Sequence, residues 1–288
     1  MSSKGSCAAI ALTMFLFAVP NVGAQTEWEN PLKIELREGR PVIGMTVTVP
    51  STDVVVQGCS LGFDFLWIEM EHSPITLETL RDMILATRGF RTMPIVRVPV
   101  NELWTAKRAL DAGALGVIFP FVSTAELARQ AVAACKYPPH GLRGSGAGLA
   151  TLRWPAPGGY MDFADKNVMV ICIIEQAKAV ENIEEIAAVP GIDVLFIGPS
   201  DLSFSLGLRG RQDEPKLREA IAKVVEAAKR HKVALGRTAS PSQIPEFVKQ
   251  GFQFFQAPSE LGMMVTGARP YLQAVGKDTA APTPRPMY

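Results

Sequence analysis

The fold is decided by a short apolar run that stops at Gly-Pro and is followed by an acid: Gly191-Ile-Asp-Val-Leu-Phe-Ile-Gly-Pro-Ser-Asp201. Its apolar centre is typical of a strand that is buried on both faces. Gly198-Pro199 ends the strand, and Ser200 or Asp201 is suited to cap the next turn. A second run, Val168-Met-Val-Ile-Cys-Ile-Ile-Glu175, also ends in an acid. At the ends of neighbouring parallel strands, two such carboxylates can share one divalent cation.

Strand-like and helix-like segments alternate along most of the chain. Apolar runs recur at residues 42–49, 63–68, 94–98, 115–119, 168–174, 193–197, 233–236 and 252–255. Helical patterns lie at residues 53–59, 77–87, 103–112, 125–135, 180–188, 216–231, 243–250 and 260–275. Glycines stand just before strands, where helices end, at positions 62, 89, 113, 191 and 251. Eight alternating units without hairpin signals predict a single-domain (β/α)8 TIM barrel over residues 25–276.

The first 24 residues have the pattern of a secretory signal peptide. Lys4 precedes an apolar run at residues 7–19, and Val22-Gly23-Ala24 supplies small residues for cleavage after Ala24. The run is short for a membrane span, and an uncleaved anchor is the alternative. We therefore expect an exported protein, in a bacterial periplasm, that is not bound to the membrane after cleavage.

Composition narrows the class of protein. Hydrophobic residues make up 48% of the chain, which is enough for a large core. Lys and Arg number 29 against 28 Asp and Glu, without a basic stripe interleaved with aromatics, so nucleic acid is not an expected partner. Cys59, Cys135 and Cys172 follow the signal without metal-ligand spacing. Cys172 is expected to be buried, and a disulfide between Cys59 and Cys135 is left open.

Two segments depart from the alternation. Residues 136–167 form a Gly- and Pro-rich insertion, and a segment of that length in a compact barrel is usually a lid or a subunit contact. Because it follows the helix of the fourth unit, part of it must cross one face of the barrel. Residues 277–288, which include Ala-Pro-Thr-Pro-Arg-Pro, are expected to be a disordered tail.

Barrels carry their chemistry at the carboxyl ends of the strands, so the residues there can be treated as a ring. The second strand ends in Glu69-Met-Glu71-His72, the third in Arg97, the fifth in Glu175 and the sixth in Asp201. Unpaired charges buried at such a mouth cost on the order of several kcal/mol. The joint pattern therefore indicates a functional site.

Each of these side chains also has a structural interpretation. His72 could be held beside a helix cap by Ser73 or Glu71. Arg97 could pair with a neighbouring glutamate for stability alone. Glu175 precedes a helix and could cap it. Taken singly, none of these residues distinguishes chemistry from structure.

The motifs occur together in one order: Glu69-Met-Glu-His72, Arg97-Val-Pro, Tyr137-Pro-Pro-His-Gly-Leu-Arg-Gly-Ser-Gly, Ile174-Glu175 and Ile197-Gly-Pro-Ser-Asp-Leu-Ser203. On these motifs, residues 39–276 resemble the metal-dependent class II aldolases of the HpcH/HpaI family. This is the 2,4-dihydroxyhept-2-ene-1,7-dioate and 2-dehydro-3-deoxyglucarate aldolase group. The resemblance implies a carbon–carbon lyase that cleaves a 4-hydroxy-2-oxo acid to pyruvate, or a related 2-oxo acid, and an aldehyde.

The same resemblance implies a divalent cation, with Mg²⁺, Mn²⁺ and Co²⁺ as candidates. Glu175 and Asp201 would be its ligands. The 2-oxo acid would bind beside Gly198-Pro199, where the backbone N–H groups of Ser200 and Asp201 would hold its carboxylate.

The resemblance also implies roles for three further residues. His72 would be the general base, acting directly or through a water, and Arg97 would stabilise the enolate oxygen. The aspartate that polarises this histidine in the family matches Asp111, which a barrel places at the rim opposite its own His72. We therefore expect Asp111 to serve a neighbouring subunit of a homo-oligomer. A helix-end aspartate with a purely structural role is the alternative.

Two departures from the family pattern argue against assigning a family member's exact substrate to this chain. Glu69 stands where the family often has aspartate, and Met70 stands where it has a small residue. Ile173 stands where many members have a substrate-binding glutamine. The loss of that polar contact suggests an altered substrate preference.

Three other functions are kept in view. A Schiff-base aldolase would use Lys178, but no lysine stands inside a strand at its carboxyl end. A related barrel could cleave or condense acyl-CoA substrates, and an exported barrel could bind 2-oxo acids with little turnover. Ser145 lacks a G-x-S-x-G elbow, and neither a Walker loop nor a G-x-G-x-x-G after a strand is present, so hydrolase chemistry and nucleotide cofactors are not expected.

Overall fold

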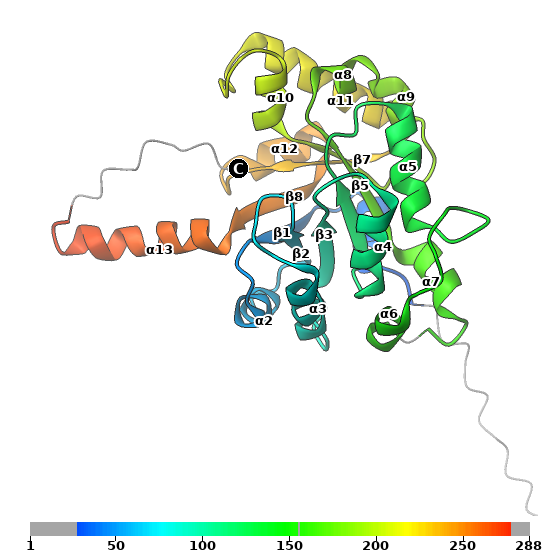
Figure 1. The fold of residues 1–288 in the computed structure, drawn as a ribbon. Helices are drawn as coiled ribbons and strands as arrows, with labels where there is room; N and C mark the ends of the chain where they lie inside the picture. Colours follow the sequence, from blue (N-terminus) through cyan, green and yellow to red (C-terminus); the bar gives the residue numbers. More distant parts are fainter. Residues whose placement is uncertain (1–27, 155, 278–288) are drawn as a thin grey trace, which may run out of the picture.

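The computed structural model describes residues 28–154 and 156–277 (Figure 1). Eight parallel strands form a closed barrel in chain order, with the last strand paired to the first. The strands are β1 Val42–Val47, β2 Phe65–Glu69, β3 Met93–Arg97, β4 Gly116–Phe119, β5 Met169–Ile174, β6 Val194–Ile197, β7 Ala234–Thr238 and β8 Phe252–Ser259. This confirms the predicted (β/α)8 barrel. The predicted signal peptide at residues 1–24 and, apart from Lys277, the predicted tail lie outside the described residues.

Helices surround the barrel, except for the last one, which extends away from it (Figure 1). Their bounds are α1 Pro31–Arg37, α2 Thr52–Ser60, α3 Leu77–Ala86, α4 Leu103–Asp111, α5 Ala125–Cys135, α6 Gly148–Arg153, α7 Tyr160–Asn167, α8 Ala177–Glu181, α9 Ile183–Ala187, α10 Pro199–Ser205, α11 Pro215–His231, α12 Ile244–Gln250 and α13 Glu260–Ala274. The helix predicted at residues 180–188 is divided at Asn182, whose side-chain amide donates a hydrogen bond to the Ser123 carbonyl over 2.9 Å. All five glycines predicted to end helices have φ between +90° and +110°, where a Cβ atom would be strained.

The barrel interior is filled with aromatic side chains below its mouth. Phe65 and Phe254 stack with ring centroids 4.3 Å apart, and Trp67 lies 4.9 Å from Phe196. A Cβ atom on Gly44 would come within 2.1 Å of the Phe65 ring, so β1 needs glycine there. The barrel is therefore a packed core, and any chemistry must take place at its rim.

The insertion at residues 136–167 closes the amino-terminal end of the barrel. Trp154 donates its indole N–H to the carbonyl of Gly113, which lies just before β4. Just before α1 begins, Asn30 donates its backbone N–H to Asn167 Oδ1 over 2.7 Å and its side-chain amide to the Asn167 carbonyl over 2.8 Å. A lid over the chain's own mouth, one of the two roles expected for this insertion, is therefore wrong, because the segment packs at the opposite end.

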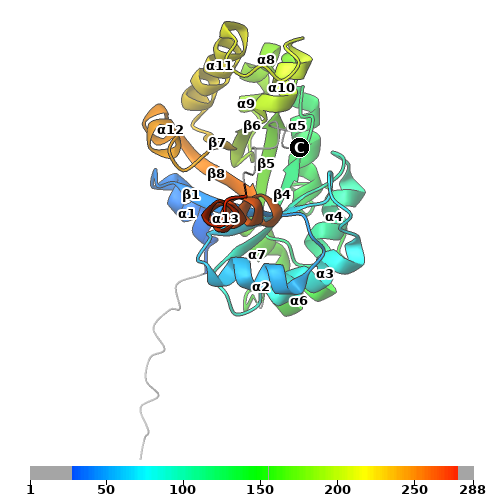
Figure 2. The same cartoon turned by 90° about the vertical axis from the view of Figure 1, so that its left-hand side faces the viewer.

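Helix α13 extends away from the barrel instead of covering it (Figure 1), and Figure 2 views it nearly end-on. None of its side chains is buried, and Met264, Val265 and Tyr271 are exposed. Its first residue is fixed, because the Glu260 carboxylate accepts hydrogen bonds from the backbone N–H groups of Thr48 and Val49, over 2.9 and 2.6 Å. The predicted helix at residues 260–275 is confirmed, but it leaves its own barrel.

Cys59, Cys135 and Cys172 are buried free thiols, so the disulfide left open between Cys59 and Cys135 is not formed. Burial raises the pKa of the Cys135 thiol to about 12. Within residues 28–154 and 156–277, no helix has the length and apolar character needed to cross a membrane.

Candidate active site

Arg97, at the end of β3, lies among three glutamates: Glu69 and Glu71 at and just after the end of β2, and Glu175 just after β5. Its Nη1 atom is 3.5 Å from Glu69 Oε2, and its Nη2 atom is 3.6 Å from Glu175 Oε2. Nη2 also forms an ion pair with Glu71, while Arg97 Nε has no hydrogen-bond partner in the described protein. Burial of the whole group makes these contacts stronger than surface ion pairs. The structural pairing considered for Arg97 is therefore present, and it joins the carboxylates of the mouth.

Glu69 fixes the turn that carries His72. One carboxylate oxygen accepts the backbone N–H groups of Glu71 and His72 over 2.7 and 3.1 Å. The other accepts the indole N–H of Trp67 over 3.0 Å, and Ser73 donates its hydroxyl to the Glu69 carbonyl. The longer acid that departs from the family pattern is thus fully hydrogen-bonded. The part played by Trp67 was not predicted, since an indole in an apolar strand resembles any core residue.

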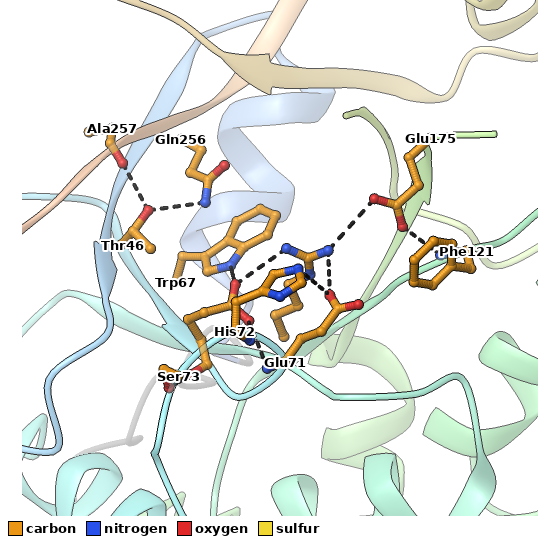
Figure 3. Close-up of polar contacts among 11 residues, drawn as sticks. Thr46, Trp67, Glu71, His72, Ser73, Phe121, Glu175, Gln256 and Ala257 are labelled. Atoms are coloured by element: carbon orange, nitrogen blue, oxygen red, sulfur yellow. Dashed lines mark hydrogen bonds and ion pairs between the residues drawn. The ribbon is translucent and has the colours of Figure 1, made fainter. Parts of the chain in front are cut away.

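His72 lies at the rim of this cluster (Figure 3). Its side chain is 41% exposed, and its Nε2 atom is 3.6 Å from Glu71 Oε2. Exposure on one side and a carboxylate on the other are what a base needs to receive a proton from a bound substrate.

Glu175 is buried where β5 ends. Its Oε1 atom accepts the backbone N–H of Phe121 over 2.7 Å, and Phe121 has a left-handed φ of 54°. A Cβ atom on Gly198 would lie 3.1 Å from Glu175 Cβ, so glycine lets the end of β6 approach this acid closely. Phe121 escaped prediction because it acts through a backbone group that every non-proline residue has.

Burial raises the pKa values of Glu71 and Glu175, each to about 7. The charge of Arg97 opposes the shift, whereas the charges of Glu69 and Asp201 add to it. Desolvation therefore outweighs the one guanidinium that all three glutamates contact. In their ionised forms, the three glutamates would carry more negative charge than Arg97 balances.

The carboxylates suit a hard divalent cation. Asp201 lies in the first turn of α10, after Gly198-Pro199 and Ser200, and its side chain is exposed. Glu175 and Asp201 provide oxygen donors, and a cation would relieve the excess negative charge of the cluster. In the described part of the chain, no three His, Cys, Asp or Glu side chains form a preformed metal site. The donor set therefore fits a cation that keeps water or substrate as its other ligands.

Asp111 lies at the other end of the barrel, where α4 ends. Its Oδ1 atom accepts a hydrogen bond of 2.9 Å from Arg143, whose side chain is completely buried and is also 3.4 Å from the Tyr160 hydroxyl. Asp111 also lines a hollow of about 430 Å³ with Arg81 and Arg108. Within one chain, Asp111 is thus separated from the mouth, and its service to a neighbouring subunit stays a prediction.

Residues 43–266 match the family model described as HpcH/HpaI aldolase/citrate lyase. The chain belongs to the HpcH/HpaI family. It is 40% identical to the 2-dehydro-3,6-dideoxy-6-sulfogluconate aldolase of Pseudomonas putida, over 74% of this chain and 84% of that protein. It is 34% identical to a hydroxypyruvate/pyruvate aldolase of Cupriavidus necator, over 83% of this chain and 90% of that protein.

A solved structure supports the same assignment. An HpcH/HpaI aldolase/citrate lyase family protein from Burkholderia cenocepacia superposes with a TM-score of 0.79 at 33% identity, covering 86% of this chain and 99% of the other. The prediction of an HpcH/HpaI aldolase, a carbon–carbon lyase, is therefore confirmed.

Proposed function

We propose that this HpcH/HpaI aldolase cleaves a 4-hydroxy-2-oxo acid to pyruvate, or a closely related 2-oxo acid, and an aldehyde. The observation that carries the proposal is the cluster at the mouth, where buried carboxylates surround Arg97 and His72 stands at the rim. Relatives named as hydroxypyruvate/pyruvate aldolase and as an aldolase of a 2-dehydro sugar acid support this substrate class.

Glu175 and Asp201 would hold a divalent cation, for which Mg²⁺, Mn²⁺ and Co²⁺ are the candidates. When bound, such a cation supplies positive charge and Lewis acidity to the 2-oxo acid. The carboxylate of the 2-oxo acid would meet the backbone N–H groups of Ser200 and Asp201. Gly198-Pro199 supports this placement, because it brings the first turn of α10 against Glu175.

His72 would take the proton from the C4 hydroxyl of the substrate. As the C4–O bond becomes a carbonyl, the C3–C4 bond breaks and its electron pair moves to C3 to form the enolate, while the aldehyde leaves. Arg97 would stabilise the negative charge on the enolate oxygen. The enolate then takes a proton at C3 to give pyruvate. Glu69 would contribute by holding the backbone N–H groups of Glu71 and His72 in place.

The active form would be a homo-oligomer. Two observations support this: Asp111 is separated from the mouth of its own chain, and the apolar side chains of α13 are exposed. The pattern of residues 1–24 supports export to a periplasm after cleavage. Sedimentation of the purified protein and the amino-terminal sequence of the native protein test these two points separately.

The exchange of pyruvate methyl protons for deuterium tests the proposal without knowledge of the aldehyde. It would be measured with metal-stripped protein, after restoring Mg²⁺ or Mn²⁺, and with His72→Ala. Exchange should need the metal and should fall about 10²-fold or more in the variant. The matched control is His231→Ala, because His231 lies on the surface of α11 beside Glu184. Absence of exchange under every metal would contradict the assignment.

A further inference from the structure

A set of uncharged polar side chains faces the mouth from three neighbouring strands. Thr46 is the last residue but one of β1, Thr238 ends β7 and Gln256 belongs to β8; together they are called the neutral wall. Thr238 pairs with Gln256 in register, and Gln256 pairs with Gly44. A Cβ atom on Gly44 or Gly236 would meet aromatic rings of the core, so those positions point inward, and residues two places later do so as well.

The hydrogen bonds of the wall fix which way the Gln256 amide points. Thr46 donates its hydroxyl proton to the Ala257 carbonyl over 2.8 Å. The same hydroxyl can then only accept, and it does so from Gln256 Nε2 over 3.0 Å. Gln256 Oε1 therefore points away from Thr46, and within the described residues it accepts no hydrogen bond. The side chain is partly exposed, so this oxygen is presented as an acceptor at the mouth.

The wall adjoins the catalytic cluster. Thr46 pairs in register with Trp67, whose indole N–H is bound by Glu69. Figure 3 shows Thr46 and Gln256 on one side of the mouth and Glu175 on the opposite side. A substrate whose 2-oxo acid end lies at Glu175 would therefore extend its other end toward the wall.

We propose that the neutral wall binds the aldehyde portion of the substrate and selects one that is uncharged and carries a hydroxyl beside its carbonyl. This inference rests on the function proposed above. Such a hydroxyl can donate to Gln256 Oε1. A carboxylate in its place would bring a second hydrogen-bond acceptor against Gln256 Oε1. Thr46, Thr238 and Gln256 also carry no positive charge that could bind it. An alkyl group would leave the amide oxygen buried without a donor, which is unfavourable.

The test is the kcat/KM for addition of pyruvate to three aldehydes of similar size. Glycolaldehyde carries the hydroxyl, glyoxylate carries a carboxylate and propanal carries neither. The wild type should prefer glycolaldehyde to both. In Gln256→Leu, the preference for glycolaldehyde over propanal should fall about 10-fold, because one hydrogen bond is lost and the volume is nearly kept. Thr46→Val, which removes the hydroxyl that orients the amide, should lower the same ratio.

Gln253→Leu is the matched control, because Gln253 lies on the same strand but donates to the Leu36 carbonyl at the other end. Its aldehyde ratio should equal that of the wild type. An unchanged ratio in Gln256→Leu, or a wild type that prefers glyoxylate, would overturn the proposal. Pyruvate methyl exchange in the wild type separates the two levels: exchange without aldehyde selection refutes the wall alone, whereas no exchange refutes the function on which it rests.

Discussion

The mouth and the amino-terminal end of the barrel balance their buried charges in opposite ways. At the mouth, three glutamates contact Arg97, and burial raises the pKa of two of them. At the other end, Arg143 pairs with the one carboxylate of Asp111. Arg153 has no carboxylate partner in the described chain and instead donates to the hydroxyl and carbonyl oxygens of Thr87.

The amino-terminal end compensates its buried cations only in part, because Arg143 Nε and Nη1 donate no hydrogen bond within the described residues. Arg143 lies 4.7 Å from the ring centre of Tyr137, and Arg153 lies 3.9 Å from that of Trp154, so aromatic faces and carbonyls compensate the cations. The mouth has no such fixed compensation for its surplus of carboxylates. In a (β/α)8 barrel the carboxyl ends of the strands carry the chemistry, and the carboxylates at that end support the cation site proposed above.

Removing divalent metal should have the largest effect on the mouth. Pyruvate methyl exchange should fall about 10³-fold or more after chelation, because the loss of a Lewis acid costs several kcal/mol of transition-state stabilisation. Mg²⁺, Mn²⁺ and Co²⁺ would be added back in turn. Full exchange in metal-free protein would contradict the proposal that a divalent cation at the mouth is needed to form the enolate.

Replacing the arginine of the mouth should be the next largest effect. Arg97→Met should lower the exchange rate about 10²-fold, since the enolate loses a charged partner in a buried site. The measurement is the exchange rate per folded molecule, with the folded fraction taken from circular dichroism. A rate within twofold of the wild type would assign Arg97 to structure alone.

The corresponding change at the amino-terminal end should affect stability instead. Arg143→Met should lower the free energy of unfolding by about 3 kcal/mol, because it breaks a buried ion pair, while the exchange rate of the folded protein stays unchanged. Urea denaturation measures the first quantity and the deuterium assay the second. A selective loss of activity would contradict the division of the barrel into two ends.

Asp111 lies at the amino-terminal end of its own barrel but is predicted to act at the mouth of a neighbouring subunit. If it polarises the histidine of a neighbouring subunit, Asp111→Asn should lower kcat about 10-fold and shift the pH profile, in addition to destabilising the pair with Arg143. Arg143→Met is its control, since that variant keeps the carboxylate. An unchanged kcat and pH profile would leave Asp111 with the structural role alone.

The smallest expected effect is the pH dependence of stability in metal-free protein. Glu71 and Glu175 have pKa values of about 7, above the ordinary value of 4.5, so the folded state binds more protons than the unfolded state between these values. Their contribution to stability is complete below pH 4.5 and is lost as the pH rises through 7. The melting temperature should therefore fall over this range, and Glu71→Gln should flatten the curve. A melting temperature that rises from pH 5 to 8 would contradict the assignment.

The alternation of the sequence was sufficient to predict the barrel, because strands buried on both faces are apolar without interruption. It failed at the end of β8, which was expected to stop at residue 255 and continues to Ser259. Gln256 faces the mouth, so the residue that interrupts the apolar pattern is also the one proposed to bind the aldehyde. The pattern of α13 likewise predicted a helix, but periodicity does not specify the surface against which a helix packs.

Most residues of the candidate site were predicted from the rule that barrels carry their chemistry at the carboxyl ends of the strands. The groups that hold those residues in place were missed. Arg97 and Glu175 are charged residues in apolar surroundings, which sequence reveals directly. Phe121 donates its backbone N–H to Glu175, 54 residues further along the chain, whereas Trp67 donates its indole N–H to Glu69, two residues along the same strand. The first contact depends on how separate units of the barrel meet, and the second uses an indole that resembles any core residue of an apolar strand.

The first residue of α13 links this exposed helix to the rim of the barrel. A helix of 15 residues is about 22 Å long, and no side chain of α13 is buried along that length. At its first residue, the Glu260 carboxylate accepts hydrogen bonds from the backbone N–H groups of Thr48 and Val49, just beyond Thr46. A partner bound to α13 would therefore also be connected, through Glu260, to the backbone that follows Thr46 beside the proposed aldehyde site.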